Sequence, residues 1–270
     1  ADFYSYVCRM IGQNGRRGAL MVSMDIRHPD IEKFVTMKHD LTKVTGANVS
    51  VKISDSFMEA VENKEMFTLQ FPVDAKDPTH ISQIDAAALW DTIIESATKT
   101  AEPGLLMWDN IIKNLPAHAY DDFKTLTTNP CGEIPLSAYD SCRLISLNLK
   151  HLVKNAFKKN ATFDFDKLKD IAATGMRLSD DLVELELEKL ENIRQHADTE
   201  DESALWSKLY KAAHDGRRTG LGTHGLADAI ARLGLAYDSE EALKVIDKIY
   251  ATLKNTAYEE SVNLAQERGA

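Results

Sequence analysis

The first half of the chain alternates apolar runs of strand length with segments of helical periodicity, and this alternation limits the fold more than any other feature. The segments 18–26, 47–54 and 66–73 have the length and the β-branched or aromatic content of strands. The segment 84–100 repeats its apolar residues at helical spacing. Strands that alternate with helices pair in parallel through crossover helices, so this half predicts an α/β fold.

Local signals add further elements to this half. Ser54 or Asp55 is placed to cap a short helix that follows the second strand. The apolar runs 104–110 and 142–149 predict two more strands. The chain shows no internal repeat and no low-complexity tract, so we expect an ordinary globular architecture.

The second half changes character. The segments 165–195, 201–215 and 240–268 are long and helical in pattern. A glycine-punctuated stretch separates the last two, and the segment 155–163 is the most loop-like break before them. We interpret that break as a shift of layer within one domain.

Composition excludes several classes of protein. The 270 residues carry a formal net charge of -10, which argues against a broad nucleic-acid-binding face. The three cysteines show no CxxC spacing, which argues against a disulfide scaffold or a zinc knuckle and favours a reducing cytoplasm. No apolar run reaches the roughly 18 residues of a membrane span. The eight histidines are scattered, so no metal ligand set is expected.

One loop carries the chemistry. Two cysteines, Cys131 and Cys142, lie eleven positions apart, and the first stands between Asn129 and Glu133 in the stretch NPCGE. A nearby carboxylate disfavours a thiolate by like-charge repulsion, so Cys131 suits hydrogen-atom chemistry better than nucleophilic attack. Glu133 would act as a general base on a substrate hydroxyl, and Asn129 would hold that hydroxyl by hydrogen bonds.

The pattern N-x-C-x-E alone does not decide between this chemistry and a structural cysteine beside a loop carboxylate. The structural alternative is the more frequent one for a chance match. A cysteine hydrolase is a third alternative, and it is weakened because no histidine lies near Cys131 in the sequence and because the carboxylate opposes a thiolate.

The stretch 129–149, "NPCGEIPL…DSCRLISLNL", resembles the active-site signature of the ribonucleotide reductase large chain. The resemblance implies a ten-stranded β/α barrel with the first cysteine on a finger loop. Cys131 is then the thiyl radical that takes the 3′-hydrogen, and Glu133 and Asn129 contact the ribose hydroxyls. Cys142 matches the second reducing cysteine. The short gap between the two cysteines is similar to the adenosylcobalamin-dependent branch, since many iron-dependent relatives carry an insertion there.

The resemblance continues on both sides of the finger. The stretch 12–21 resembles the flexible loop that links the allosteric specificity site to the substrate base, and it implies that Gln13, Asn14, Arg16 and Arg17 reach a base edge or phosphate. The stretch 216–237 resembles a strand and helix of the barrel, with His224 kept as a structural residue. We therefore expect a single catalytic-barrel portion over 1–270, with strand–helix alternation in 1–154 and a helix-rich continuation in 155–270.

Other parts of the family are not found in these 270 residues. They include the first reducing cysteine and the loop that holds the substrate phosphates. Cys8 matches the stretch before the specificity loop and is expected to be structural, although a Cys8–Cys142 redox pair is an open alternative. The resemblance thus implies a central portion of a catalytic chain that is inactive alone and needs complementary chains.

The implied ligands are a ribonucleoside di- or triphosphate and a dNTP or ATP effector. The radical would come from adenosylcobalamin, which the cysteine spacing favours, or from a metal-containing small subunit. The rival hypothesis is a non-catalytic α/β protein that keeps the fold and binds a nucleotide or a partner chain. Loss of activity on Cys131→Ala or Glu133→Ala, as opposed to retained binding, distinguishes the two.

Overall fold

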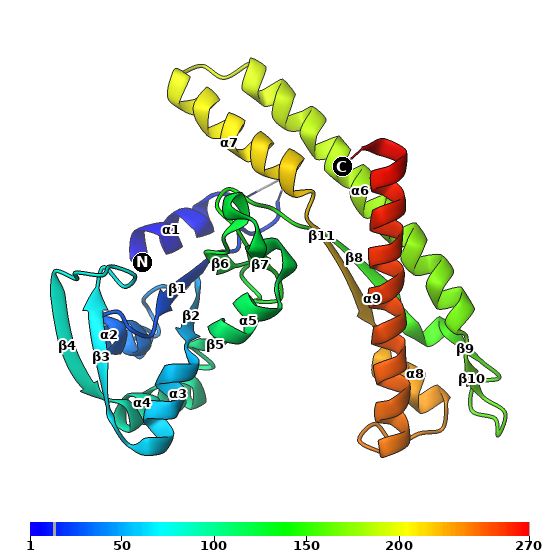
Figure 1. Ribbon diagram of the computed structural model, residues 1–270, viewed down its shortest axis with the longest axis horizontal. Coiled ribbons are helices and arrows are strands. Elements are labelled where there is room, and N and C mark those ends of the chain that lie inside the picture. The colour runs from blue at the N-terminus through cyan, green and yellow to red at the C-terminus, as the bar shows by residue number, and fades with distance from the viewer. Residues whose placement is uncertain (13–14, 270) are drawn as a thin grey trace. The chain divides into compact units, whose positions relative to one another are not determined.

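A computed structural model describes residues 1–12 and 15–269, and these gather into two compact units, 1–138 and 139–270. Figure 1 shows the chain from the N-terminal helix α1 (Asp2–Met10) to the long C-terminal helix α9 (Glu240–Arg268). Each unit has its own hydrophobic core.

The first unit is built on a parallel sheet. Strands β1 (Met21–Asp25), β2 (Asn48–Ile53) and β5 (Gly104–Met107) lie in the order β1-β2-β5, and both pairs are parallel. The connections between them contain helices α2 (Ile31–Thr36), α3 (Asp55–Asn63) and α4 (Ala86–Thr100). The predicted strand–crossover–strand pattern is therefore confirmed for this sheet.

The prediction of parallel pairing is wrong for the strand expected at 66–73. Strand β3 (Met66–Phe71) pairs antiparallel with β4 (His80–Asp85), which the sequence pattern did not separate from the helix that follows it. The cause is the segment 72–79, where prolines and aspartates form a turn that returns the chain along β3. Asp85 then ends β4 and caps α4, because its Oδ1 accepts a hydrogen bond from Ala88 N at 2.9 Å.

The predicted strand 104–110 is also too long, since β5 ends at Met107 and helix α5 (Trp108–Asn114) begins at once. The short helix after β2 is confirmed, and Ser54 is its cap, with Oγ accepting from Phe57 N at 3.2 Å. The unit closes with 3₁₀ turns η1 (Pro116–Ala119) and η2 (Asp121–Phe123) and a small hairpin of β6 (Thr127–Thr128) and β7 (Pro135–Leu136).

The core of the first unit lies between the sheet and its helices. Alternate residues of β2 supply its centre, because successive side chains of a strand point to opposite faces. The fully buried members with the largest side chains are Ile26, Ile31, Val51, Ile53, Phe57, Leu89 and Ile93.

The second unit begins with a parallel strand pair. Strand β8 (Arg143–Asn148) pairs with β11 (Thr219–His224), from Arg143↔Thr219 to Asn148↔His224. Turn η3 (Leu149–Leu152) and the hairpin of β9 (Val153–Lys154) and β10 (Thr162–Phe163) follow β8. Helix α8 (Leu226–Arg232) follows β11, so the strand and helix expected within 216–237 are present.

Three long helices cover this unit, as Figure 1 shows: α6 (Phe165–Gln195), α7 (Glu200–Gly216) and α9. The bounds predicted for the first and last of them are confirmed. Capping fixes where α6 begins, because Oδ1 of Asp164 accepts a hydrogen bond from Lys167 N at 3.1 Å. The helix-rich character expected for the second half is therefore confirmed, while the boundary at 154/155 stays a prediction.

Candidate active site

The cysteine loop is the tip of the β6–β7 hairpin, which we call the finger (residues 127–136). Asn129 holds the tip closed, because its backbone N–H donates to Ile134 O at 3.1 Å and its Oδ1 accepts from Ile134 N at 2.9 Å. Gly132 N donates to Asn129 O at 3.0 Å, and Gly132 adopts φ +87°. A left-handed residue at this position favours glycine. The asparagine therefore shapes the loop besides the substrate contact predicted for it.

Cys131 and Glu133 differ in their surroundings. The Cys131 thiol is exposed and lines a cavity of about 530 Å³ at the amino-terminal ends of β1, β2 and β5. Glu133 is also exposed, and within the described residues its carboxylate has no hydrogen-bond or ion-pair partner. Among those residues, neither Asn129 nor Glu133 lines this cavity. The structure thus places all three on one finger, but only the thiol faces the cavity.

The inner wall of the cavity is the polar face of the sheet. Along β2, the buried Val49, Val51 and Ile53 alternate with Asn48, Ser50 and Lys52. The finger crosses this second face, since Asn48 Nδ2 donates to Pro130 O at 2.7 Å. Strand β2 therefore contributes to the hydrophobic core with one face and contacts the cysteine loop with the other.

Lys52 lies further along the same face of β2 and lines a smaller cavity together with Trp108. Its Nζ lies 4.2 Å from the centre of the Trp108 ring and donates to Leu126 O. Burial lowers the pKa of Lys52 below its ordinary value. The aromatic face and the carbonyl offset part of this cost by interacting with the charged form.

The loop predicted to contact nucleotide is partly described. Gln13 and Asn14 lie outside the described residues, while Arg16 and Arg17 are exposed. Arg17 lines a second cavity of about 560 Å³, to which Arg9 and Lys38 contribute two more cations. Glu102 already pairs with Lys38, so Arg9 and Arg17 are the cations of this lining that suit an anionic ligand. Asn48 lines both this cavity and the one beside Cys131.

Cys8 packs against the same loop. A Cβ atom added at Gly18 would lie 2.7 Å from the Cys8 carbonyl oxygen and 3.1 Å from its Sγ. Glycine is therefore required at position 18 because the helix and the loop approach so closely. This contact agrees with a structural role for Cys8, and a Cys8–Cys142 redox pair stays the alternative prediction.

Cys142 belongs to the second unit, where it directly precedes β8. The thiol is half-buried, and its Sγ lies 3.7 Å from the carbonyl oxygen of Arg143. Charged residues on either side fix the backbone here. Asp140 pairs with Arg218 at 2.6 Å, and only 1% of the Asp140 side chain is exposed.

Arg143 provides the other anchor of this segment. Its guanidinium is 7% exposed and pairs with Glu186 of α6, while its Nη1 donates to the carbonyls of Ser141 and Arg218, each at 3.3 Å. Glu186 also accepts from Ser141 Oγ at 3.0 Å. A buried guanidinium needs this carboxylate, because an unpaired charge in the interior is costly.

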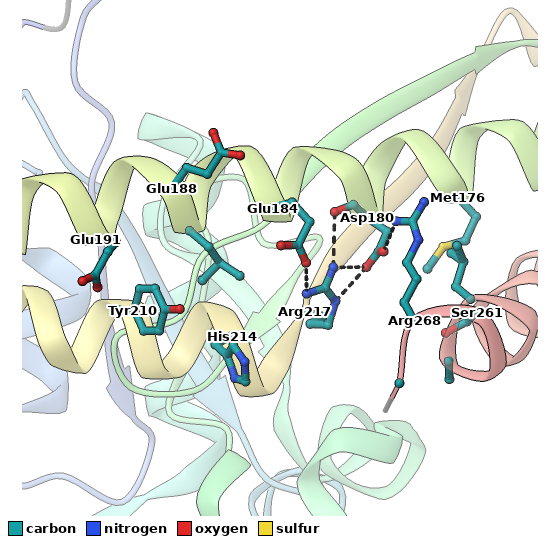
Figure 2. Close-up of a pocket in the computed structure, with 14 residues that line it drawn as sticks. Met176, Asp180, Glu184, Glu188, Glu191, Tyr210, His214, Arg217, Ser261 and Arg268 are labelled. Carbon is teal, nitrogen blue, oxygen red and sulfur yellow. Dashed lines mark hydrogen bonds and ion pairs between the residues drawn. The ribbon is translucent and has the colours of Figure 1, made fainter.

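A cavity of the second unit is lined by charged residues that pair with one another. It measures about 610 Å³ and lies between α6, α7 and the end of α9. Figure 2 shows Arg217 between Asp180 and Glu184, with Arg268 on the far side of Asp180. The charges of these four residues compensate one another, so the cavity indicates no ligand.

Sequence reasoning missed the supporting residues. Asn48 and Lys52 were marked by their alternation with buried valines in "NVSVKI", which assigns polar side chains to one face of a strand. Arg143 was marked as a charge that opens an apolar strand directly after Cys142. Neither signal reveals its partner, because Pro130 and Glu186 are distant in sequence.

Parallel strands with crossover helices define an α/β protein, in which the cysteine finger lies against one face of the first sheet. A family model described as "Ribonucleotide reductase, barrel domain" matches residues 2–270. The chain belongs to this family, which confirms the predicted resemblance and fold class.

Curated relatives agree with this assignment. Over 99% of this chain, 33% of residues are identical to a vitamin B12-dependent ribonucleoside-diphosphate reductase of Mycobacterium tuberculosis, of which the match covers 35%. A protein of the same name from Thermoplasma acidophilum is 34% identical over 96% of this chain and 31% of its own length. The putative large subunit of Frog virus 3 is 31% identical over 94% of this chain and 42% of its own length. The chain thus spans about a third of the first two relatives.

Within 1–12 and 15–269, no three or more histidine, cysteine or acidic side chains gather as metal ligands. In the same ranges, no helix combines the length and the apolar character of a membrane span.

Proposed function

We propose that this chain is the finger-bearing part of a ribonucleotide reductase that converts ribonucleotides to 2′-deoxyribonucleotides for DNA synthesis. The observation that carries the proposal is the exposed Cys131 thiol on a finger that lines a nucleotide-sized cavity. That cavity shares Asn48 with the basic cavity lined by Arg17. A substrate that spans both would place its phosphate or base near the arginine and its ribose near the thiol.

The first step uses the finger. The Cys131 thiyl radical takes the 3′-hydrogen atom, so that an S–H bond forms and the radical moves to C3′. Glu133 accepts the proton of the 3′-hydroxyl, a role that its unpaired carboxylate in the described structure allows. Asn129 would donate a hydrogen bond to a ribose hydroxyl through its Nδ2, since its Oδ1 is bound to Ile134.

The second step removes the 2′-hydroxyl as water. Cys142 and a second cysteine from outside this chain provide two electrons and two protons and form a disulfide. Cys131 then returns its hydrogen atom to C3′, and the thiyl radical is regenerated. The balance is one ribonucleotide and one dithiol converted to one deoxyribonucleotide, one disulfide and one water.

The radical source is proposed to be adenosylcobalamin, which the names of the relatives and the short gap between the cysteines favour over a metal-containing small subunit. The described residues do not themselves fit a corrinoid. The cavity beside Cys131 is of the size that holds a nucleotide or drug-sized molecule, and its described lining contains no histidine. We therefore assign the binding of adenosylcobalamin to other parts of the reductase.

The remaining partners follow from the same proposal. They are a ribonucleoside di- or triphosphate, a dNTP or ATP effector at the loop of Arg16 and Arg17, and complementary reductase chains. A reducing cytoplasm is the compartment in which Cys131 and Cys142 stay available as thiols. Neither a nucleic acid nor a membrane is assigned as a partner.

The test is an assay of ribonucleotide reduction with the chain alone and with the products of neighbouring genes. Each mixture is tested with adenosylcobalamin and, separately, with a candidate metal subunit. We expect activity in a mixture that contains adenosylcobalamin and loss of that activity on Cys131→Ser. Nucleotide binding without turnover in every mixture would overturn the proposal and favour the non-catalytic alternative.

A further inference from the structure

The finger and the residue directly before it are attached to the sheet by two side chains. Lys52 of β2 donates to Leu126 O, and Ser23 Oγ of β1 lies 2.9 Å from Thr127 Oγ1. Ser23 is opposite Ser50 in the parallel register, so it lies on the same polar face as Lys52. These contacts fix where the finger begins but leave its tip to other interactions.

The tip of the finger is attached to the sheet by a hydrogen bond from Asn48. The Nδ2 of Asn48 donates to the carbonyl oxygen of Pro130 at 2.7 Å. That carbonyl belongs to the peptide group that joins Pro130 to Cys131. A shift of this hydrogen bond therefore moves the Cα of the cysteine directly.

Asn48 is also tied to the neighbouring loop. Its backbone N–H donates to Leu20 O at 2.7 Å, at the end of the segment that carries Arg17. The residue lines both cavities of the first unit. Asn48 thus makes hydrogen bonds both to the loop that carries Arg17 and to the cysteine finger.

We propose that Asn48 is a positioning residue that holds the Cys131 thiol at the distance from the substrate that hydrogen-atom transfer needs. This inference rests on the function proposed above for the finger. The donor is the essential feature, because the Pro130 oxygen accepts and a carboxylate at position 48 would repel it. A misplacement of about 1 Å at a reacting atom lowers rates by up to ~100-fold.

The experiment compares Asn48→Asp with Asn48→His in the active mixture of the reduction assay. Asn48→Asp removes the donor at nearly constant size, whereas the His Nδ1–H retains a donor at a similar position. Asn192→Asp on the exposed face of α6 is the matched control for the added charge. For each variant, kcat, KM and the isotope effect of 3′-deuterated substrate are measured.

We expect Asn48→Asp to lower kcat by about 10- to 100-fold with KM little changed. The 3′-deuterium isotope effect should increase, because hydrogen transfer becomes slower than the other steps. Asn48→His should recover most of the lost kcat, and Asn192→Asp should match the wild type. A loss caused only by misfolding would lower kcat in proportion to the folded fraction and leave the isotope effect unchanged.

A second measurement does not depend on turnover. Amide hydrogen exchange at Gly132 and Ile134 reports how firmly the tip is held, and loss of one hydrogen bond should accelerate it about five-fold in Asn48→Asp. Exchange in the core strand around Val51 should stay unchanged.

The outcomes separate this inference from the proposed function. Wild-type kcat and exchange in Asn48→Asp, with an inactive Cys131→Ser, would overturn the positioning role and leave the proposed function intact. Equal losses in Asn48→Asp and Asn48→His with an unchanged isotope effect would also overturn it. Full activity of Cys131→Ser would overturn both proposals.

Discussion

The ion pair behind Cys142 offers a test of how this segment is stabilised. The Arg143 guanidinium is 7% exposed, and within the described residues its Nε makes no hydrogen bond. Glu186 is its carboxylate partner and is 32% exposed. Glu186→Ala would leave a buried cation unpaired, which costs about 3–5 kcal/mol. We expect the lower end, about 3 kcal/mol, because water reaches the exposed part of the site.

The assay is urea unfolding of the whole chain, followed by circular dichroism. With an m-value of about 3 kcal/mol/M, the expected loss shifts the midpoint down by roughly 1 M. Glu184→Ala on the same helix is the matched control, since this carboxylate also pairs with an arginine but is 55% exposed. Its expected cost is below about 1 kcal/mol.

A double variant identifies the cause. Arg143→Met combined with Glu186→Leu removes both charges and keeps the volume, so the free energy of unfolding should return to within about 1 kcal/mol of the wild type. The reasoning is refuted if Glu186→Ala costs no more than Glu184→Ala. It is also refuted if the double variant is as unstable as Glu186→Ala, because lost packing would then explain the effect.

Two further predictions concern carboxylates. Glu133→Gln should lower kcat of the active mixture by about 10²–10⁴-fold with substrate affinity retained, because the general base is lost, whereas the exposed control Glu59→Gln should have no effect. A hydrogen bond from Lys154 lowers the pKa of Asp164 below its ordinary value of 3.8. The stability that Asp164 adds relative to Asp164→Asn should therefore be complete above that ordinary value and disappear as pH falls through the lowered pKa; a difference in unfolding midpoint that persists at the lowest pH would contradict this.

Local patterns predicted the elements that are long or strongly periodic. The helices 165–195 and 240–268 were predicted with their observed bounds, because each carries a clear helical period and a capping residue at its start. The strand around Val51 was equally clear, since its polar and apolar residues alternate. These signals depend only on neighbours within a few positions.

The element that was predicted wrongly is one whose structure depends on pairing with another strand. Strand β4 has no buried residue, so its sequence gave no alternation strong enough to separate it from α4. It exists because β3 provides hydrogen-bonding partners along its whole length, from Phe71↔His80 to Met66↔Asp85. Such partners are invisible to a local pattern, and the antiparallel direction follows from the short turn between the two strands.

For the candidate site, the sequence by itself predicted the chemistry. The residues Asn129, Cys131 and Glu133 follow one another within five positions, so their functional groups and their loop could be recognised without a structure. Their spacing to Cys142 also carried the resemblance to the reductase family. What the sequence could not decide was how the thiol is held in place.

Only the tertiary structure decided that. It places Asn48 against the carbonyl before Cys131, although 82 positions separate Asn48 from Pro130. It likewise places Glu186 against Arg143. The physical reason is that the chemical type of a side chain is given at one position of the sequence. The residue that it contacts depends on how the strands and helices pack. The candidate reactive residues could therefore be predicted from the sequence, whereas the residues that hold them in place were identified only from the tertiary structure.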